Sequence, residues 1–486
     1  MTAEENREDT TSVTTKLQDL DVQKPIHFIG VGGCGMSGIA LSLRKMGYVI
    51  SGSDMYESAT LERLRAAGVT VNVGHNGGNI APDTQLVVFS AAVKPDNPEY
   101  MAAAVRKIEL IKYARMLGLL MASHRGIAIA GTHGKTTTTG MVALALRELG
   151  ADPSFVIGGS VPQLGGGSGI GSSDYLVAEA CEYDRSFLNL SPRYAIINNI
   201  EEDHLDYYSG LDEIVQAFHD FTNLLPGDGL LVYSASSPNI ARFIAQAPCR
   251  TISCALDHEA DYWADEIRYV NGQSLYRLHT RRQDGKAGAG ERTCDVALNT
   301  FGRHNVINSL SAIALLAELG FDLEASARGV GLFRGANRRF EIIHNQGGIT
   351  IVDDYAHHPT EILTVLRSSR TYFEGRRLIA VFQPHQHSRT RFLMKDFARS
   401  FQHADLVVVP DIYFVRDSEQ ERAMVHARDL VREIVRHGGN AIYIPSFREI
   451  EGFLENNMSE GDVLLTMGAG NVWEIGAHLA AKWKKG

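Results

Sequence analysis

The chain has 486 residues, of which 44% are hydrophobic and 21% charged, and its formal net charge is −10. This length exceeds what one hydrophobic core supports, and it indicates about three domains with the composition of a soluble globular protein. The acidic balance argues against nucleic acid as a partner, so an anionic substrate would have to be attracted by local clusters of Lys and Arg.

The N-terminal segment, residues 1–22, is polar and acidic, and we expect a disordered lead that lacks the regions of a signal peptide. No apolar run approaches the ~20 residues that a membrane-spanning helix needs, so we expect no membrane span. The five cysteines are scattered and never spaced C-x-x-C. This pattern favours a reducing cytoplasm over a disulfide framework or a thiolate zinc site.

Residues 23–124 are predicted to form a Rossmann-like first domain. A buried strand over residues 25–29 ends in the sequence G-V-G-G-C-G at 30–35, and an amphipathic helix follows. This G-x-G-x-x-G pattern, with Asp54 about twenty residues further on, is typical of a loop that binds a pyrophosphate. Ser90 ends a later strand, at the edge where open α/β sheets hold ligands. A dinucleotide such as NAD is one interpretation, and a tight turn without a ligand is the other.

Residues 125–330 are predicted to form a central domain of the P-loop ATPase type, opened by the sequence I-A-I-A-G-T-H-G-K-T-T-T-T at 127–139. A strand, a glycine loop and a helix N-terminus in this order form a cradle for phosphate. Lys135 would neutralise the β- and γ-phosphates, and Thr136 would ligate Mg²⁺. The loop is shorter than the usual G-x-x-x-x-G-K-[ST], because Ile129 occupies the first glycine position. A chance Gly-Lys-Thr turn is the alternative.

Two polar clusters, residues 179–184 and 198–206, follow strands predicted over 175–178 and 194–197. Carboxylates packed at strand ends repel each other unless a cation joins them. The clusters therefore predict a Mg²⁺ held by Thr136, one of their carboxylates and His204. For any single acidic residue, a solvated loop charge is the alternative.

The remainder of the central domain is predicted in less detail. The glycine-rich residues 165–171 indicate a flexible surface loop without a role in chemistry, and residues 281–292 a solvated loop. A hairpin-rich part is expected around residues 262–279. Asn305 and Asn308 share one face of an apolar helix and could hydrogen-bond a base, although helix capping explains them equally well.

Residues 331–486 alternate strands and helices, which predicts a mostly parallel, Rossmann-like C-terminal domain. Its strand ends carry the polar runs D-D-Y-A-H-H-P-T-E at 353–361 and Q-P-H-Q-H-S-R-T-R at 383–391. Arginines in such loops typically bind carboxylate or phosphate groups. The alternative is that these arginines are exposed and have no role in binding. Zinc on His357 and His358 is a weaker interpretation, because adjacent histidines lack helical i, i+4 spacing.

Taken together, these motifs resemble those of the Mur ligases, from about Ile26 to Ile475. They are G-T-H-G-K-T-T-T-T at 131–139, E-x-x-E-x-D at 179–184, E-x-D-H-x-D at 201–206, H-N-x-x-N at 304–308, and the two C-terminal runs. The chain resembles most the branch that adds L-alanine. The rival is the branch that attaches a whole murein peptide to the same sugar nucleotide, which is less similar at residues 384–391.

The resemblance implies an ATP- and Mg²⁺-dependent ligase that joins L-alanine to the lactyl carboxylate of UDP-N-acetylmuramic acid through an acyl phosphate, for peptidoglycan synthesis in the cytoplasm. A monomer or a dimer is expected. The implied catalytic residues are Lys135, Glu182, His204, His357 and Arg389, with Mg²⁺ on Thr136, Glu182 and His204.

The resemblance also assigns the binding residues. Those for ATP are Gly131, Thr132, His133, Gly134, Lys135, Thr136, Thr137, His304, Asn305, Asn308, Arg339 and Asp353, with Asp354 as an alternative for the ribose. Those for the UDP-sugar are Gly30, Gly32, Gly33, Gly35, Met36, Asp54 and Ser90. Those for the amino acid are Tyr355, His357, His358, His385, Arg389 and Arg391.

Some positions depart from the family pattern. Cys181 and Tyr183 stand where many alanine-adding members have Asp and Ser, and Gln386 replaces a usual Arg. No lysine lies between Lys135 and Lys286, which counts against the branches that carry a carbamylated lysine. An NAD-dependent dehydrogenase and a nucleotide-binding regulator without catalysis remain as alternatives of other classes.

Overall fold

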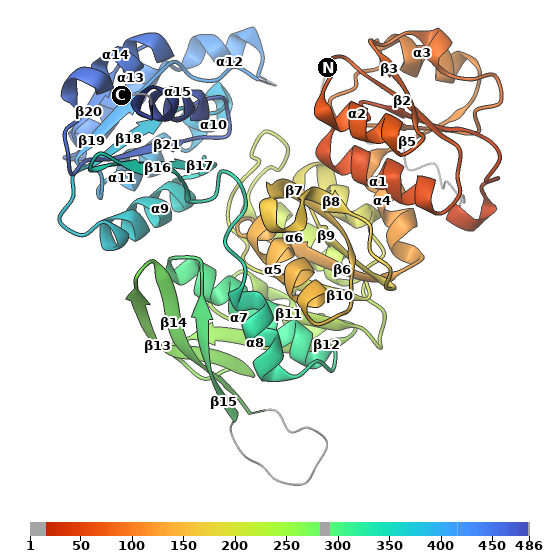
Figure 1. The fold of residues 1–486 in the computed structure, drawn as a ribbon, viewed down its shortest axis with the longest axis horizontal. Helices are drawn as coiled ribbons and strands as arrows, with labels where there is room; N and C mark the ends of the chain where they lie inside the picture. The colour runs from red at the N-terminus through yellow and green to blue at the C-terminus, as the bar shows by residue number, and fades with distance from the viewer. Residues whose placement is uncertain (1–15, 282–291, 416, 485–486) are drawn as a thin grey trace.

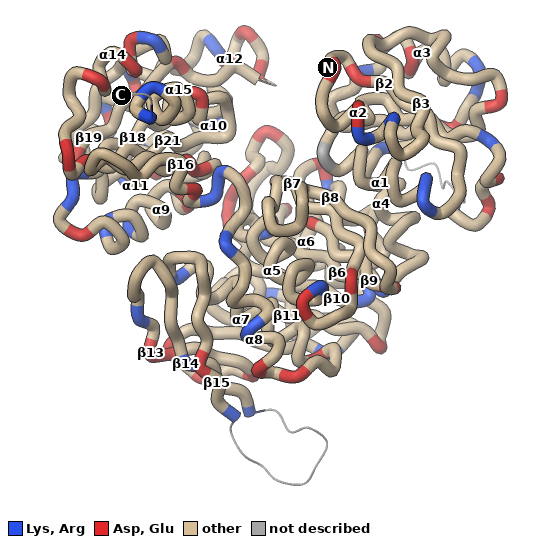
Figure 2. Tube along the Cα trace, in the orientation of Figure 1, with Lys and Arg blue, Asp and Glu red and all other residues tan. Residues whose placement is uncertain are grey.

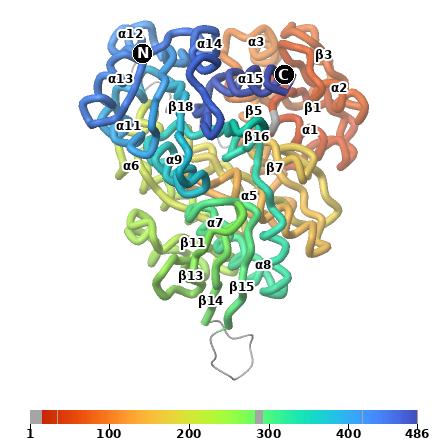
Figure 3. Tube along the Cα trace, turned by 60° about the vertical axis from the view of Figure 1, so that its left-hand side comes forward, coloured from red at the N-terminus to blue at the C-terminus, as the bar shows by residue number. Residues whose placement is uncertain are grey.

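The computed structural model describes residues 16–281, 292–415 and 417–484, and their strands form three separate sheets (Figure 1). Each sheet is mostly parallel and is flanked by helices, which confirms the predicted class of three α/β domains. The first and C-terminal domains lie on the same side of the central domain in both views of the chain (Figures 1 and 3). The boundaries of the three domains, at residues 23–124, 125–330 and 331–486, stay predictions from the sequence.

The first sheet has the strand order β3-β2-β1-β4-β5, and all its pairs are parallel. β1 is buried along its whole length because its apolar run is covered on both faces. The strand order reverses beside β1, so the loop that follows it lies at the crevice where such sheets bind ligands. The strands are β1 (Ile26–Ile29), β2 (Ile50–Asp54), β3 (Thr70–Val73), β4 (Leu86–Phe89) and β5 (Glu109–Lys112), and the helices are α1 (Cys34–Lys45), α2 (Ala59–Ala66), α3 (Pro98–Val105) and α4 (Tyr113–Ala122).

The predicted disordered lead, residues 1–22, falls partly outside the described residues, at 1–15. Its other part is placed: a 3-10 turn, η1 (Leu17–Asp19), buries Leu17, and the Tyr48 hydroxyl donates to the Leu17 carbonyl at 2.7 Å. The prediction of disorder is wrong for residues 16–22, because Leu17 has an apolar site to fill against the first domain.

The central sheet has ten strands in the order β15-β14-β13-β12-β11-β10-β6-β9-β7-β8. The predicted hairpin is confirmed, since β13 and β14 pair antiparallel. The strands are β6 (Arg125–Ala130), β7 (Ser154–Val161), β8 (Gly166–Gly169), β9 (Tyr175–Glu179), β10 (Tyr194–Ile197), β11 (Leu230–Ser234), β12 (Arg250–Leu256), β13 (Tyr262–Val270), β14 (Gln273–Thr280) and β15 (Arg292–Leu298), and the helices are α5 (Lys135–Glu148), α6 (Leu211–Thr222), α7 (Arg303–Glu318) and α8 (Leu323–Gly331).

The prediction of a flexible surface loop at residues 165–171 is wrong. Four of these residues form β8, which pairs antiparallel with β7. A Cβ added at Gly38 of α1 would lie 2.4 Å from the Ser168 Cβ, so the first domain packs closely on this strand. Gly38 permits this approach, and within the strand a Cβ at Gly169 would lie 2.3 Å from the Phe155 ring. The solvated loop predicted at residues 281–292 lies outside the described residues, except at its two ends.

The C-terminal sheet has the order β16-β17-β21-β18-β19-β20, with only the edge strand β16 antiparallel among the strands described. The strands are β16 (Glu341–Gln346), β17 (Ile349–Asp354), β18 (Leu378–Phe382), β19 (Leu406–Val409), β20 (Ala441–Tyr443) and β21 (Val463–Met467). The helices are α9 (Pro359–Tyr372), α10 (His387–Phe392), α11 (Met394–Ser400), α12 (Glu419–Met424), α13 (Ala427–Arg436), α14 (Phe447–Asn457) and α15 (Trp473–Trp483).

Acidic and basic residues are interspersed along the described parts of all three domains (Figure 2). None of the helices in the described ranges combines the length and the apolarity that crossing a bilayer requires. The four cysteines whose side chains the structure describes are all free.

Candidate active site between the central and C-terminal domains

The glycine loop lies at the carboxyl end of β6, which pairs with β10 on one side and β9 on the other. The two polar clusters follow β9 and β10, so parallel pairing brings all three segments to one edge of the sheet. Gly134 has φ +82°, a left-handed conformation that glycine adopts without strain, and α5 begins at the next residue. The strand, loop and helix therefore stand in the predicted order.

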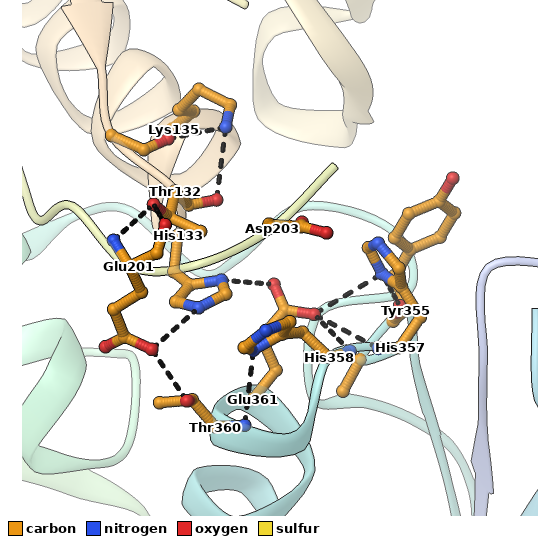
Figure 4. A network of polar contacts seen from close by, with 12 residues as sticks. Thr132, His133, Lys135, Glu201, Asp203, Tyr355, His357, His358, Thr360 and Glu361 are labelled. Carbon is orange, nitrogen blue, oxygen red and sulfur yellow. Dashed lines mark hydrogen bonds and ion pairs between the residues drawn. The ribbon is translucent and has the colours of Figure 1, made fainter. Parts of the chain in front are cut away.

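Lys135 folds back over the loop (Figure 4). Its Nζ donates to the carbonyls of Gly131 at 2.5 Å and Thr132 at 3.1 Å, and it lies 2.9 Å from the Glu182 carboxylate. Burial alone would lower the pKa of Lys135, but Glu182 outweighs it and raises the pKa. The ammonium is thus held charged at the point where the loop would meet a phosphate.

Two of the three predicted magnesium ligands, Glu182 and His204, lie at this ion pair. Glu182 is buried, and its Oε1 lies 3.8 Å from Nε2 of His204. His204 has φ +55°, an uncommon conformation for a non-glycine residue that turns its side chain toward Glu182. A hydroxyl and a carboxylate are suitable magnesium ligands, so Thr136 and Glu182 fit the ion, whereas the imidazole of His204 suits it less well.

A cavity of about 240 Å³ lies between the glycine loop, the start of α7 and α9 of the C-terminal domain. Eight of the predicted ATP-binding residues line it: His133, Gly134, Thr136, Thr137, His304, Asn305, Asn308 and Arg339. Burial lowers the pKa of His304 to about 4, so its ring is neutral at physiological pH. The cavity thus places the backbone of the predicted phosphate loop beside the neutral ring of His304 and the amides of Asn305 and Asn308.

Of the two adjacent aspartates, Asp354 reaches this cavity and Asp353 does not. The Asp353 carboxylate is paired with Arg338 at 2.9 Å and accepts from Thr466 at 2.7 Å. Burial raises the pKa of Asp354 to about 6. Of the two residues predicted for the ribose, Asp354 is therefore the one that faces the cavity, because successive residues of a strand point to opposite faces of the sheet.

The predicted UDP-sugar residues lie together at the carboxyl end of β1, in the first domain. The Gly32 N–H donates to Asp54 Oδ2 at 2.8 Å, and a Cβ at Gly30 would lie 2.9 Å from the Ser90 hydroxyl. Met36 is buried at the start of α1. Asp54 therefore stabilises the glycine loop by accepting a hydrogen bond from the backbone of the loop.

Most of the predicted amino-acid residues form a cluster in the C-terminal domain, with two exceptions. The rings of His357 and His385 lie 6.3 Å apart, and Arg389 Nη1 lies 3.4 Å from His385 Nδ1. Tyr355 packs under the guanidinium groups of Arg338 and Arg339, and burial lowers the pKa of the nearby His357 to about 3. The exceptions are His358, whose ring lies 5.0 Å from that of His133 in the glycine loop, and Arg391.

Arg391 points toward α12, where it forms paired hydrogen bonds with the Glu421 carboxylate at 3.0 and 3.2 Å. The prediction that both arginines of the R-T-R run hold the amino acid therefore fits Arg389 only. Residues two apart at the start of a helix face different directions, and a sequence does not show which of them faces the site.

Sequence reasoning missed several polar residues of the site. The most connected is Glu361, whose Oε1 accepts from His133 at 3.1 Å and whose Oε2 accepts from the backbone N–H groups of His357 and His358. The H-P-T-E spacing of a capping box could have indicated it. The others are Asn199, Glu201 and Asp203, which lie inside or beside the motifs but were not among the predicted site residues.

Three family models together match most of the chain. The model described as "Mur ligase family, catalytic domain" matches residues 25–125, the "Mur ligase middle domain" residues 129–316, and the "Mur ligase, glutamate ligase domain" residues 338–470.

The chain is also similar to individual proteins. It is 40% identical to the UDP-N-acetylmuramate–L-alanine ligase of Desulforamulus reducens, over 94% of this chain and 97% of that protein. Among solved structures, the UDP-N-acetylmuramate–alanine ligase of Thermotoga maritima matches with a TM-score of 0.76 and 28% identity, over 95% of this chain and 100% of that one. A murein peptide ligase of Psychrobacter arcticus matches with a TM-score of 0.67 and 26% identity, over 94% and 98%.

Proposed function

Since the chain belongs to the Mur ligase family, we propose that it joins L-alanine to UDP-N-acetylmuramate with ATP as the energy source, in the synthesis of peptidoglycan precursors. The observation that carries this proposal is the cavity between the central and C-terminal domains. It brings the Gly-Lys-Thr loop next to residues of α7 and α9. The near full-length similarity to alanine-adding ligases supports UDP-N-acetylmuramate and L-alanine as the substrates.

ATP would lie in this cavity, with its triphosphate on the glycine loop. His304, Asn305 and Asn308 line the cavity and would contact the adenine, and Asp354 would accept a hydrogen bond from the ribose. Lys135 is held charged by Glu182 and would neutralise the γ-phosphate as the lactyl carboxylate attacks it. Thr136 and Glu182 would hold Mg²⁺, which when bound supplies further positive charge to the phosphates.

The amine of L-alanine would then attack the resulting acyl phosphate from the side of the C-terminal domain. The cluster of His357, His385 and Arg389 presents the Arg389 cation beside the neutral imidazole of His357, which suits the amino-acid carboxylate. Contacts between the two domains close the site against the water that would hydrolyse the acyl phosphate.

The UDP-sugar would bind at the glycine loop after β1, in the crevice of the first domain. A second candidate is ligation of a whole murein peptide, because the murein peptide ligase structure also matches nearly the full chain and because Gln386 departs from the alanine-adding pattern. We place the enzyme in the cytoplasm, where ATP and nucleotide sugars are made.

The test is phosphate release by the purified chain with UDP-N-acetylmuramic acid, ATP and Mg²⁺, after addition of L-alanine, glycine, L-serine or the murein tripeptide. We expect release with L-alanine and formation of UDP-N-acetylmuramoyl-L-alanine, detected by mass spectrometry. Release with the tripeptide alone would replace the proposal by the second candidate.

A Lys135→Ala variant should lose phosphate release by at least about 100-fold, because the loop then lacks the ammonium that would neutralise the γ-phosphate. A Lys112→Ala variant is the matched control, since Lys112 pairs with Asp184 in the same region but is exposed. Equal turnover by the two variants would remove the glycine loop from the mechanism.

A further inference from the structure

Three side chains from both sides of the domain interface converge next to the nucleotide cavity: His133, Glu201 and His358. Each offers one ligand atom, and the three atoms lie within 4.8 Å of one another. His133 belongs to the glycine loop, Glu201 follows β10, and His358 is the N-cap of α9 (Figure 4). None of them is among the predicted magnesium ligands.

In each of the two histidines, one ring nitrogen faces an oxygen acceptor, and this contact orients the ring. His133 Nδ1 faces Glu361 Oε1 at 3.1 Å, and His358 Nε2 faces the Glu202 carbonyl at 3.0 Å. These contacts leave His133 Nε2 and His358 Nδ1 as the nitrogens that would face an ion, which would displace the proton on His133 and the long N-cap bond that His358 Nδ1 accepts from the Thr360 N–H at 3.4 Å. Metal-binding histidines nearly always have this arrangement, with the second N–H donated to a carboxylate or a carbonyl.

The third ligand is oriented in the same manner. The Thr360 hydroxyl donates to Glu201 Oε2 at 2.6 Å, and His133 Nε2 lies 3.5 Å from that same oxygen. His133 Nε2 is buried and makes no hydrogen bond within the described residues. In a tetrahedral zinc site with bonds of about 2.0 Å, neighbouring ligand atoms lie about 3.3 Å apart. The three ligand atoms would therefore have to approach one another by at most about 1.5 Å.

A path leads to this cluster from outside the nucleotide cavity. A second cavity, of about 320 Å³, is lined by Glu201, Glu202, His358 and Asp396, with Arg399 as the basic residue of its described lining. Its excess of carboxylates attracts a cation toward the two residues that it shares with the cluster. A divalent ion in the second cavity would meet Glu201 and His358, whereas His133 lines the first cavity.

We propose that His133, Glu201 and His358 form a binding site for a zinc-type transition-metal ion, separate from the magnesium of catalysis. Two imidazoles and one carboxylate are a donor set that zinc and cobalt prefer over magnesium, with water at the fourth position. The ion would tie the glycine loop to α9 and so hold the central and C-terminal domains in the arrangement described here. It replaces the proton that the two neighbouring carboxylates otherwise keep on His133, whose pKa they raise to about 9 against the effect of burial.

The test is a titration of the full-length chain, free of substrates, with Co²⁺ as the probe. We expect one Co²⁺ per chain and the intense visible absorption of four-coordinate cobalt, which Zn²⁺ abolishes and millimolar Mg²⁺ does not. His133→Ala, Glu201→Gln and His358→Asn should each weaken cobalt binding at least tenfold. Asn is chosen at 358 because it is a good N-cap and keeps α9 intact.

The matched control is His357→Asn, which removes the adjacent imidazole and should leave cobalt affinity within twofold. Glu182→Gln should also leave it unchanged, because Glu182 belongs to the predicted magnesium site. Loss of the cobalt band in Glu182→Gln but not in His358→Asn would overturn the proposal, as would octahedral cobalt in the unmodified chain. Circular dichroism identifies a variant that fails to fold, and Glu201→Gln, the mildest change, then decides the outcome. The titration needs no turnover, so its failure is distinguishable from failure of the proposed ligase activity.

Discussion

At the scale of single residues, His133 is the point where the glycine loop meets the C-terminal domain. Its ring lies between two carboxylates, Glu201 and Glu361, at 3.5 and 3.1 Å (Figure 4). Burial by itself would lower the pKa of His133, but the two carboxylates raise it to about 9. The residue is therefore a cation at neutral pH in the absence of a metal ion.

This raised pKa predicts a pH dependence of stability. A group whose pKa is higher in the folded than in the unfolded chain stabilises fully below about pH 6.5 and loses that contribution as the pH rises to about 9. Between pH 6.5 and 9.5, the metal-free chain should lose about 1–3 kcal/mol of stability that a His133→Gln variant does not lose. Calorimetric melting of both proteins across this range checks it, and parallel pH profiles would contradict it.

The two adjacent aspartates permit a second residue-scale prediction. Asp354→Asn should weaken ADP binding about tenfold, because a carboxylate that faces the cavity is exchanged for a neutral amide. Asp353→Asn should leave ADP affinity within twofold and instead lower the melting temperature, since it weakens the buried pair with Arg338. Isothermal titration with ADP and thermal melting measure both effects, and the reverse outcome would restore Asp353 as the ribose residue.

At the scale of elements, the strand β6, the glycine loop and the helix α5 form the unit around which the site is built. The loop passes so close to α7 and β10 that a Cβ at Gly134 would lie 2.7 Å from Asn308 Oδ1 and 3.0 Å from Asn198 Nδ2. Sequence alone predicted this unit, because an apolar run, paired glycines and a helix-forming segment are local signals. The crowding that requires glycine comes from residues far along the chain and had no local signal.

This crowding predicts that Gly134→Ala raises the KM for ATP at least tenfold while the protein still folds. The control is Gly150→Ala at the other end of α5, which has a similar φ of +79° but nothing within 4 Å of the added Cβ. It carries the same backbone strain, about 1 kcal/mol, without the clash. Similar KM values for the two variants would mean that backbone strain, and not the contact with Asn308, governs the loop.

At the scale of the whole molecule, the C-terminal domain is held against the central domain by polar contacts. They include Thr360 to Glu201 at 2.6 Å, His358 to the Glu202 carbonyl at 3.0 Å, and Arg389 to Asp203 at 3.2 Å. Arg389 and Asp203 are both more than 90% buried. Burial would raise the pKa of Asp203, but Arg389 and His204 hold it well below the usual range. Such polar interfaces are typical of domains that separate and close.

Asp203→Asn should therefore shift the substrate-free chain toward a more open arrangement, because it leaves the buried Arg389 without its counter-ion. Small-angle scattering should show a larger radius of gyration for this variant, and lower activity at subsaturating L-alanine should accompany it. Asp206→Asn is the matched control, since Asp206 bonds Tyr183 within the central domain. An unchanged radius in the Asp203 variant would mean that the other contacts suffice to hold the domains together.

The sequence by itself determined the class of three α/β domains, the two glycine loops and the polar strand ends, because periodicity and turn residues act over a few neighbouring positions. It also determined the family, through motifs whose residues are adjacent in the chain. Only the tertiary structure decided which of two neighbours faces the site, as with Asp354 over Asp353 and Arg389 over Arg391. Only the structure joined His133, Glu201 and His358, which lie up to 225 positions apart in the numbering of the chain. Such contacts depend on how strands pair and domains dock, and these are interactions between distant segments.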